Sequence, residues 1–567
     1  MSSMPSSHRD SSCARLRGYA AYFVLLGAGT CAPLLAQAAP PSAAPVRPYR
    51  IAGKLLNSVT GEPVMQATVE ALDEENQRTV QSVLTDSDGN FALGGLRAGK
   101  YPLTASKRGF QTGFYDEHEG YNSAIVTGPG QDTEHLLFGL TPSAMLRGVV
   151  SGDDGDPVDG ATVMLFKLPP GMGRDFRRAR APADRIHQAG SETTDDTGAY
   201  EFSNLGPGDY VLAVQAEPWY ALHPSARASR PAALSEAAAA LDVAYPVTYF
   251  DSTTDESAAT PIHLAGGFHQ EADINLHAVA ALRLTVAVPR KPQGGIARAE
   301  LRQTIFGAQV SALSEGFLNS LRTGTVQFTG LAPGHYELWQ GDPPRVANLD
   351  ATVSGQVDAS GGTPTFAVTG TLRTTTGEPL PNQLGVSLDP TDAGGHLGMS
   401  APAATGHFQF ENVPAGAWNL TVSSAGQPMG ILALQADGAT HAGSAVVVAD
   451  HPLNLTATVA LGETHLKGFA RKDGKGFGGA LVVLVPRNPA TFDGLVRRDQ
   501  SDSDGSFSMV HVAPGQYTLI AIQDGWDLLQ AGPEALAHYL PGGTSVTVKA
   551  NSGALLSLTA AVTVQPR

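Results

Sequence analysis

The sequence predicts an all-β chain, organised as a tandem array of about five small antiparallel β-sandwiches. Three observations support this prediction. The 567 residues include 64 Gly and 39 Pro, which indicates many short elements separated by turns. A chain of this length is expected to form about three to five domains, and its 42% hydrophobic residues suffice for packed cores. The third observation is a segment that recurs five times along the chain.

Residues 1–38 are predicted to be a secretory signal peptide. Arg15 and Arg17 precede an apolar run over 19–36, and residues 36–38 read Ala-Gln-Ala, a small-x-small cleavage site. A permanent anchor is the alternative, but glycines and a proline interrupt the run, which is short for a spanning helix. We therefore expect an exported protein without a membrane span after cleavage, located in the periplasm, on the outer surface or outside the cell.

Charge and cysteine content narrow the expected chemistry. Both cysteines, Cys13 and Cys31, lie in the predicted signal, so no disulfide, thiolate ligand or cysteine nucleophile is expected afterwards. A lipoprotein site at Cys31 is an alternative, although Thr30 before it is larger than such processing prefers. The formal charge is −16, and such an acidic chain is a poor partner for nucleic acid, whose phosphates require Lys and Arg.

The recurring segment contains two glycines ten residues apart, with an aromatic residue two positions after the second. The glycine pairs are Gly89 and Gly99, Gly198 and Gly208, Gly324 and Gly334, Gly406 and Gly416, and Gly505 and Gly515. The aromatic residues are Tyr101, Tyr210, Tyr336, Trp418 and Tyr517.

This spacing predicts a strand, a turn and a second strand. The first Gly lies in a polar turn where a positive φ is easiest for Gly, Asn or Asp. Apolar residues then alternate, as in Phe91 and Leu93, which indicates one buried face. We expect the aromatic side chain to fill the core beside the second turn.

A second signature opens most repeats. Gly53, Gly148, Gly370 and Gly468 each follow the start of a short apolar strand, and a hairpin-like turn follows the first three, at 60–63, 154–157 and 376–379. The third repeat lacks a clear opening Gly, so its first strands are not assigned. The predicted repeats span 47–141, 142–280, 281–361, 362–461 and 462–567. The second carries insertions at 169–191, which is rich in Arg, and at 221–241, where a short helix is expected.

These motifs resemble the carboxypeptidase regulatory-like domain of exported bacterial proteins, a transthyretin-like, Ig-like β-sandwich that is grouped with carbohydrate-binding-like folds. The resemblance is carried by the opening glycine strand, the Gly-x-Pro turn, the Asp-rich turn with Gly, and the aromatic strand. It implies an accessory domain rather than a peptidase, because no His has a Glu three positions later. It also implies carbohydrate as a candidate ligand.

No motif predicts an enzyme, a cofactor or a metal site. Neither His-Glu-x-x-His nor Gly-x-Ser-x-Gly occurs, and the stretch from Gly94 to Lys100 resembles a phosphate loop only until Tyr101 replaces Ser or Thr. The turns at 86–89 and 502–505 read Asp-Ser-Asp-Gly and could offer carboxylates to Ca²⁺. They lack the remaining ligands of a calcium loop, so bonding to local backbone N–H groups is the favoured interpretation.

Aromatic residues near strand ends are the candidate ligand-binding residues. Planar rings can cover the apolar faces of sugars, and packing between neighbouring repeats is the alternative role. The candidates are Phe110, Phe114, Tyr115, Trp219, Tyr220 and Trp526.

Taken together, the sequence predicts an exported, non-enzymatic binding or spacer module at the cell envelope, with a glycan or an envelope protein as partner. One alternative is a structural or assembly partner of an outer-membrane or peptidase complex, in which edge strands receive a partner strand. A further alternative is a hydrolase with an unrecognised site. The sequence predicts no particular oligomeric state.

Overall fold

The computed structural model describes residues 49–567 apart from several internal gaps. The predicted signal peptide, much of the Arg-rich insertion and the turn at 376–379 lie outside the described residues. No helix in the described part is long and apolar enough to cross a membrane. The gaps are 75–76, 170–185, 224–235, 289–298, 314, 321–323, 359, 375–379, 381–383, 392–398, 404, 425–426, 442, 460–463, 490–491, 530 and 550–554.

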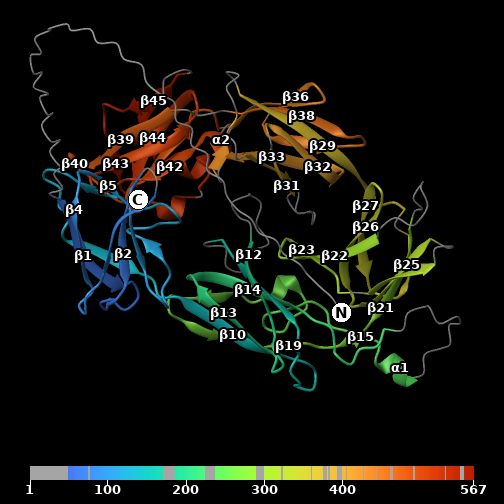
Figure 1. Cartoon of the computed structure of the whole chain (residues 1–567). Helices are drawn as coiled ribbons and strands as arrows, with labels where there is room; N and C mark the ends of the chain where they lie inside the picture. The colour runs from blue at the N-terminus through green and yellow to red at the C-terminus, as the bar shows by residue number, and fades with distance from the viewer. Residues whose placement is uncertain are drawn as a thin grey trace, which may run out of the picture. The chain divides into compact units, whose positions relative to one another are not determined.

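Strands make up most of the described chain, which confirms the all-β prediction (Figure 1). Helical segments are short: the α-helices are α1 (Glu236–Ala240), α2 (Phe492–Leu495) and α3 (Pro533–Leu536). The helix α1 lies in the insertion where a short helix was expected. Short 3₁₀ turns include η3 (Glu256–Ala258), η5 (Trp526–Leu528) and η6 (Leu540–Gly542).

The first repeat forms sheets in the orders β4-β1-β9 and β3-β2-β6-β7, with a separate β5-β8 pair. Alternate residues of these strands point inward and form one apolar cluster that includes Ile51, Phe91, Leu103 and Phe138. The strands are β1 (Tyr49–Asn57), β2 (Thr68–Leu72), β3 (Thr79–Leu84), β4 (Asn90–Leu96), β5 (Gly99–Tyr101), β6 (Leu103–Ser106), β7 (Gly113–Phe114), β8 (Ile125–Thr127) and β9 (Leu136–Leu140).

The second repeat forms sheets in the orders β13-β10-β18 and β12-β11-β14-β16, and its apolar cluster runs from Ala144 to Leu276. Its strands are β10 (Ala144–Ser151), β11 (Thr162–Lys167), β12 (His187–Thr193), β13 (Ala199–Leu205), β14 (Gly208–Gln215), β15 (Val243–Ala244), β16 (Thr248–Tyr249), β17 (Ile262–Leu264), β18 (His269–Glu271), β19 (Ile274–Asn275) and β20 (Val279–Ala280).

A sheet of nine strands connects the third and fourth predicted repeats, because β27 pairs with β29 at Val346 and Thr363. The strands of the third repeat are β21 (Leu282–Ala287), β22 (Ala299–Ile305), β23 (Ala308–Ser311), β24 (Glu315–Ser320), β25 (Thr325–Leu331), β26 (Gly334–Gly341), β27 (Pro344–Ala351) and β28 (Gly355–Val357). Those that follow are β29 (Thr363–Thr374), β30 (Leu384–Pro390), β31 (Met399–Pro402), β32 (His407–Pro414), β33 (Gly416–Ser424), β34 (Gln427–Met429), β35 (Ile431–Ala436), β36 (Ala439–His441), β37 (Ala445–Val448) and β38 (Leu453–Val459).

The last repeat contains a sheet in the order β40-β39-β47-β44-β41-β42, with β43, β45 and β46 attached to it. Its strands are β39 (Thr464–Lys472), β40 (Lys475–Gly476), β41 (Leu481–Pro486), β42 (Arg497–Gln500), β43 (Ser506–Val512), β44 (Gly515–Ile522), β45 (Thr544–Val548), β46 (Leu555–Ser557) and β47 (Val562–Gln565).

The opening strand of each repeat has one antiparallel and one parallel partner, so the sandwiches are not wholly antiparallel as predicted. It pairs antiparallel with the strand after the polar turn, as in β1 with β4, and parallel with a strand near the end of the repeat, as in β1 with β9. The same parallel pairing joins β10 to β18, β21 to β28, β29 to β38 and β39 to β46. A parallel pair requires a long connection, which the intervening strands of the repeat supply.

The opening glycine has a steric function. It faces an aromatic residue across the antiparallel pair in four repeats: Gly53 faces Phe91, Gly148 Tyr200, Gly370 Phe408 and Gly468 Phe507. A built Cβ would lie 2.2 Å from the ring of Phe408 at Gly370 and 2.5 Å from that of Phe507 at Gly468. At Gly53 and Gly148 it would first meet the carbonyl oxygens of Leu136 and Ala272, at 2.4 and 2.3 Å. In the third repeat Thr285 faces Gln327 instead of a glycine facing an aromatic residue.

The glycine of the polar turn adopts a positive φ in all five repeats, as predicted: 76° at Gly89, 73° at Gly198, 68° at Gly324, 84° at Gly406 and 83° at Gly505. Its carbonyl accepts a hydrogen bond from the opening strand, for example from Leu55 N–H at 2.8 Å in the first repeat. A side chain at this position would be strained by its backbone and, at Gly505, would place Cβ 2.4 Å from the carbonyl oxygen of Ala470.

The aromatic residue after the second glycine is buried in every repeat, as predicted, and it also closes a turn. Its polar atom donates a hydrogen bond to the carbonyl oxygen four residues earlier. The distances are 3.2 Å for Tyr101, 2.8 Å for Tyr210, 2.6 Å for Tyr336, 3.0 Å for Trp418 and 2.7 Å for Tyr517. One side chain therefore fills the core and satisfies a turn carbonyl.

Candidate functional site

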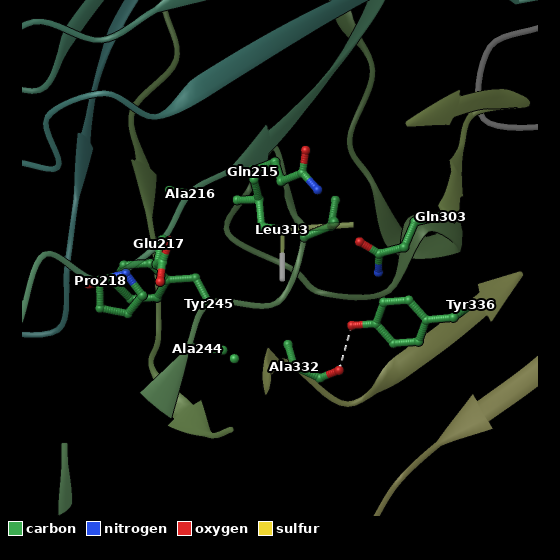
Figure 2. A pocket seen from close by; sticks show the side chains of 12 residues that line it. Gln215, Ala216, Glu217, Pro218, Ala244, Tyr245, Gln303, Leu313, Ala332 and Tyr336 are labelled. Carbon is green, nitrogen blue, oxygen red and sulfur yellow. Dashed lines mark hydrogen bonds between the residues drawn. The ribbon is translucent and has the colours of Figure 1, made fainter. Parts of the chain in front are cut away.

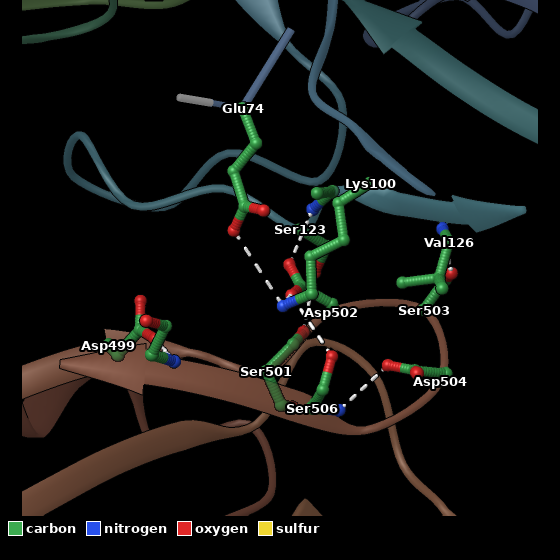
Figure 3. Close-up of polar contacts among 12 residues, drawn as sticks. Glu74, Lys100, Ser123, Val126, Asp499, Ser501, Asp502, Ser503, Asp504 and Ser506 are labelled. Atoms are coloured by element: carbon green, nitrogen blue, oxygen red, sulfur yellow. Dashed lines mark hydrogen bonds and ion pairs between the residues drawn. The ribbon is translucent and has the colours of Figure 1, made fainter. Parts of the chain in front are cut away.

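Segments of the first and last repeats form a polar contact that contains buried ionisable groups (Figure 3). We call its two sides the first-repeat face and the last-repeat face. The first-repeat face consists of Lys100, Asp116, His118, Ser123, Ala124 and Val126. The last-repeat face consists of Gln500, Ser501, Asp502, Ser503 and Trp526.

Backbone groups beside β8 receive the turn that follows β42. Ala124 N–H donates to Asp502 Oδ1 at 2.9 Å, and Ser503 N–H donates to the carbonyl oxygen of Ala124 at 3.1 Å. Val126 N–H donates to Ser503 Oγ at 2.8 Å. Because β5 pairs with β8 on its other side, the turn covers backbone groups that would otherwise require water.

An ion pair lies next to these hydrogen bonds. Lys100 Nζ contacts the carboxylate of Asp502, and it lies 3.7 Å from Glu74 Oε1 (Figure 3). Only 7% of Asp502 is exposed, and this burial raises the pKa of its carboxyl although Lys100 opposes the shift. Burial lowers the pKa of Lys100, but the nearby carboxylates, chiefly that of Asp502, together outweigh this effect and the net pKa is raised. The contact therefore encloses a charge pair in poorly solvated surroundings.

Asp499 adds a second carboxyl near the same lysine. Its Oδ2 accepts a hydrogen bond from Ser508 N–H at 2.7 Å. Loss of water around this group raises the pKa of its carboxyl to about 7, and the negative charge of Asp502 acts in the same direction. Lys100 opposes this shift but is already paired with Asp502 and close to Glu74, so protonation of Asp499 relieves its repulsion with Asp502.

A second network of hydrogen bonds connects the same two faces. Gln500 Nε2 donates to Asp116 Oδ2 and to Ser123 Oγ, both at 2.9 Å. Ser123 Oγ lies 2.9 Å from the carbonyl oxygen of Ser501, to which it can donate. The rings of His118 and Trp526 stack with centroids 4.5 Å apart and an interplanar angle of 6°. These contacts join two protein surfaces through hydrogen bonds, charge and stacking.

Cavities lie elsewhere in the described residues. A small one of about 20 Å³ lies among residues that include Gln215, Tyr245, Gln303 and Tyr336, and Figure 2 shows the Tyr336 hydroxyl turned toward Ala332. This volume suits about one water molecule. An open groove of about 570 Å³ on the second repeat is lined by Arg147, Asp195, Glu201, Glu271 and Asp273, among others.

The structure does not gather the six candidate aromatics into one site. Phe110, Phe114 and Tyr115 are partly buried in the first repeat, where the Tyr115 ring meets Phe138 edge-on with centroids 5.6 Å apart. Trp219 is 85% exposed, and its ring lies 5.8 Å from Tyr220 in an edge-to-face arrangement. Trp526 has one face covered by His118, which corresponds to packing between repeats.

Other candidate ligands are occupied by protein groups or lie apart. Asp86 Oδ1 accepts from Asp88 N–H at 2.9 Å and from Asn90 N–H at 2.8 Å, as expected for a turn aspartate. The described residues contain no group of three or more His, Cys, Asp or Glu side chains placed to hold a metal ion. Asp502 differs from Asp86 because its carboxylate binds Ala124 N–H and Lys100 of another repeat, in addition to Ser506 Oγ of its own turn.

The sequence did not identify Lys100, Ser123 or Gln500 as functional residues. The sequence places Lys100 only in a phosphate-loop likeness, and it favours local backbone N–H groups over Ca²⁺ as partners of the Asp502 turn, whereas the structure gives the Asp502 carboxylate partners in another repeat. Their pairing joins residues 402 positions apart, and no local pattern reports such a partner. The available signal is the Asp-Ser-Asp-Gly tetrapeptide, which occurs at both 86–89 and 502–505.

The chain was compared with family models, with curated proteins and with solved structures. No curated protein matches the chain by sequence. Among solved structures, the Bacillus anthracis TIE protein is 11% identical, with 69% of this chain and 68% of that chain covered and a TM-score of 0.15. The Streptococcal ancillary pilin is 14% identical, with coverages of 55% and 98% and a TM-score of 0.20.

Two B repeat units of the collagen binding protein of Staphylococcus aureus are 10% identical, with 72% of this chain and 99% of that chain covered and a TM-score of 0.12. With TM-scores this low, these likenesses support no statement about function. The model of the carboxypeptidase regulatory-like domain matches residues 50–135. This range contains the opening Gly53, the turn glycine Gly89 and the buried Tyr101. Residues 50–135 are therefore a carboxypeptidase regulatory-like domain.

Proposed function

We propose that the protein is an exported, non-enzymatic repeat scaffold that acts as a spacer and presents binding surfaces at the cell envelope. The supporting observation is the use of the recurring residues. The turn glycines, the aromatic residues and Asp86 all make contacts within their own repeats, and Asp502 joins the last repeat to the first. Residues that recur along the chain thus build and connect sandwiches, while the surfaces between them differ from repeat to repeat.

A glycan is the second candidate partner, and one feature favours it. Trp219 is 85% exposed and stands edge-to-face with Tyr220, so an open indole face is available to the apolar side of a sugar ring. Trp526 lacks this freedom because His118 covers it. A glycan platform would therefore centre on Trp219 and Tyr220 rather than on all six aromatics.

The test is a pull-down from the native envelope with the exported chain, analysed by mass spectrometry for proteins and by glycan analysis. Reproducible enrichment of one envelope protein, without enzymatic turnover, supports the scaffold proposal. Failure to enrich any envelope component, or hydrolysis by the purified protein that is lost on chelation, contradicts it.

A glycan array separates the second candidate from the first. Trp219→Ala is expected to abolish any glycan signal, whereas Trp526→Ala serves as a matched control because its ring packs on His118. Equal loss in both variants would contradict a platform at Trp219 and would point to a general effect on folding.

A further inference from the structure

The contact between the first-repeat face and the last-repeat face unites parts of the chain that are far apart in sequence. Lys100 and Asp502 are separated by 402 residues, and Ser123 and Ser501 by 378. A local loop does not connect the two faces, so the same contacts are available whether both faces belong to one chain or to two.

The two faces are complementary to each other, but neither is complementary to a second copy of itself. The first-repeat face presents the Lys100 ammonium together with the N–H groups of Ala124 and Val126. Opposite these donors, the last-repeat face presents the Asp502 carboxylate and the Ser503 hydroxyl. A first-repeat face therefore binds a last-repeat face and not another copy of itself, which makes the interface heterologous.

The composition of the contact also indicates that it can open. Ionisable and hydroxyl groups surround the stacked rings of His118 and Trp526, and the apolar part includes Tyr121 of the first repeat, which packs against a hydrophobic cluster of the last repeat. Interfaces between domains of one chain resemble transient protein interfaces. Opening returns Asp502 and Lys100 to water, where each regains its full hydration. Both faces are then free to bind a matching face.

We propose that these two faces also join neighbouring copies of the protein head to tail, with the first-repeat face of one copy bound to the last-repeat face of another. This inference extends the proposed scaffold function from one array to an assembly of arrays. Reciprocal exchange between two copies gives a closed dimer, and exchange in one direction gives a chain. Within one chain the two faces meet at an effective concentration of about 1 mM. Pairing between copies must compete with this, so it is favoured where the protein itself is crowded.

Charge exchange between two variants tests the proposal. In the Lys100→Asp variant two negative charges face each other across the contact, and in the Asp502→Lys variant two positive charges do. The repulsion acts within one chain and between copies of the same variant, so each variant alone is expected to stay monomeric. In an equimolar mixture both intermolecular contacts become complementary. We expect light scattering after size exclusion to report a doubled mass for the mixture only. The mixture is compared with Lys100→Asp/Asp502→Lys in one chain, which is complementary within itself and should remain monomeric.

A second measurement does not depend on how the charge variants fold. In a Cys13→Ser, Cys31→Ser background, Val126→Cys chains are mixed with Ser503→Cys chains, since Val126 N–H contacts Ser503 Oγ at 2.8 Å. We expect a disulfide-linked pair whose yield rises with concentration. Leu84→Cys, at a side chain of the first repeat that is 66% exposed, replaces Val126→Cys in the control. An unchanged monomer mass in the charge mixture, or cross-linking equal to that of the Leu84 control, overturns the proposal.

Discussion

The tetrapeptide Asp-Ser-Asp-Gly occurs in the first and last repeats with the same backbone and with opposite side-chain environments. Gly89 and Gly505 have φ values of 76° and 83°, and each N–H donates to the carbonyl of the first aspartate, at 3.1 and 2.7 Å. The carboxylate of Asp86 then binds N–H groups of its own turn, whereas that of Asp502 binds Ala124 and Lys100 of another repeat.

The electrostatic consequence differs in sign. Hydrogen bonds from Asn90 hold the pKa of the exposed Asp86 below its ordinary value. Burial raises the pKa of Asp502. Identical local sequences therefore fold into the same turn but differ in proton affinity, because solvent exclusion is imposed by residues outside the turn.

The largest effect is expected from changing the glycine that gives both turns the same backbone conformation. Gly505→Ala and Gly89→Ala should each destabilise their repeat by about 4 kcal/mol, since strain at positive φ adds to a Cβ clash with the opening strand. The clashing carbonyl oxygens lie 2.4 and 2.6 Å from the built Cβ. Hydrogen exchange of β44 and β6 peptides measures the loss.

Gly61→Ala is the matched control for the turn glycines. Gly61 has a φ of 73°, but its built Cβ has no neighbour within 4 Å, so only backbone strain of about 1 kcal/mol is expected. Equal losses in all three variants would show that the opening strand makes no steric demand on Gly89 or Gly505.

The second prediction concerns the pH dependence that follows from the buried carboxyl groups near the turn of the last repeat. The pKa of Asp499 is raised to about 7 by burial, so the folded state binds more protons than the unfolded state between about pH 4 and pH 7. Stability of the last repeat should therefore fall as pH rises through this window. We expect Asp499→Asn to remove about 2 kcal/mol of this fall in the free energy of unfolding. The value is smaller than the whole pKa shift of Asp499 implies, because water reaches part of the side chain.

Hydrogen exchange of β43 at several pH values measures this effect, with corrections for the intrinsic exchange rate. The first repeat serves as the internal control, since β4 follows the equivalent turn without a buried carboxyl. A wild-type protein whose β43 protection is constant from pH 4 to pH 8 would contradict the assignment.

A smaller effect is expected from the aromatic hydroxyls. Tyr517→Phe should cost about 1.5 kcal/mol, because it leaves the carbonyl oxygen of the buried Ala513 without its hydrogen bond. Tyr101→Phe should cost about 0.5 kcal/mol, because its hydrogen bond is longer, at 3.2 Å against 2.7 Å, and it lies nearer the surface. The fall in the midpoint of thermal unfolding measures the cost of each variant. A larger fall for Tyr101→Phe than for Tyr517→Phe would contradict this prediction.

The smallest effect is expected for Asp86→Asn. The amide oxygen can still accept from the backbone N–H groups of Asp88 and Asn90, and only the exposed hydrogen bond from Asn90 Nδ2 is lost, so hydrogen exchange of β4 at pH 7 should change little. Because the pKa of Asp86 is lowered, its ionic contribution is lost as pH falls below about 4 in the wild type. The variant should lack that acid dependence, and a variant that retains it would assign the dependence to another group.

Local features were predictable from the sequence to different extents. The turn glycines and buried aromatics were predicted correctly, since both depend on neighbours within about ten residues. The strands that open the third repeat were not assigned, because Thr285 and Gln327 replace the glycine and aromatic pair that marks the other repeats. The parallel partner of each opening strand was also missed, because the aromatic pattern does not specify a strand so far along the chain.

The candidate site was less predictable. The sequence placed Trp219 and Trp526 in one class, but the structure leaves Trp219 exposed and stacks Trp526 on His118. Lys100 and Gln500 carried no signal, since their importance depends on partners in another repeat.

By itself, the sequence determined an all-β chain with one turn and strand pattern written five times, because the sign of φ and the space for a Cβ are local properties. Only the tertiary structure decided that Asp502 and not Asp86 is buried, and that Lys100 is its partner. Burial and charge pairing arise when distant segments exclude water together, which a tetrapeptide shared by both turns cannot encode.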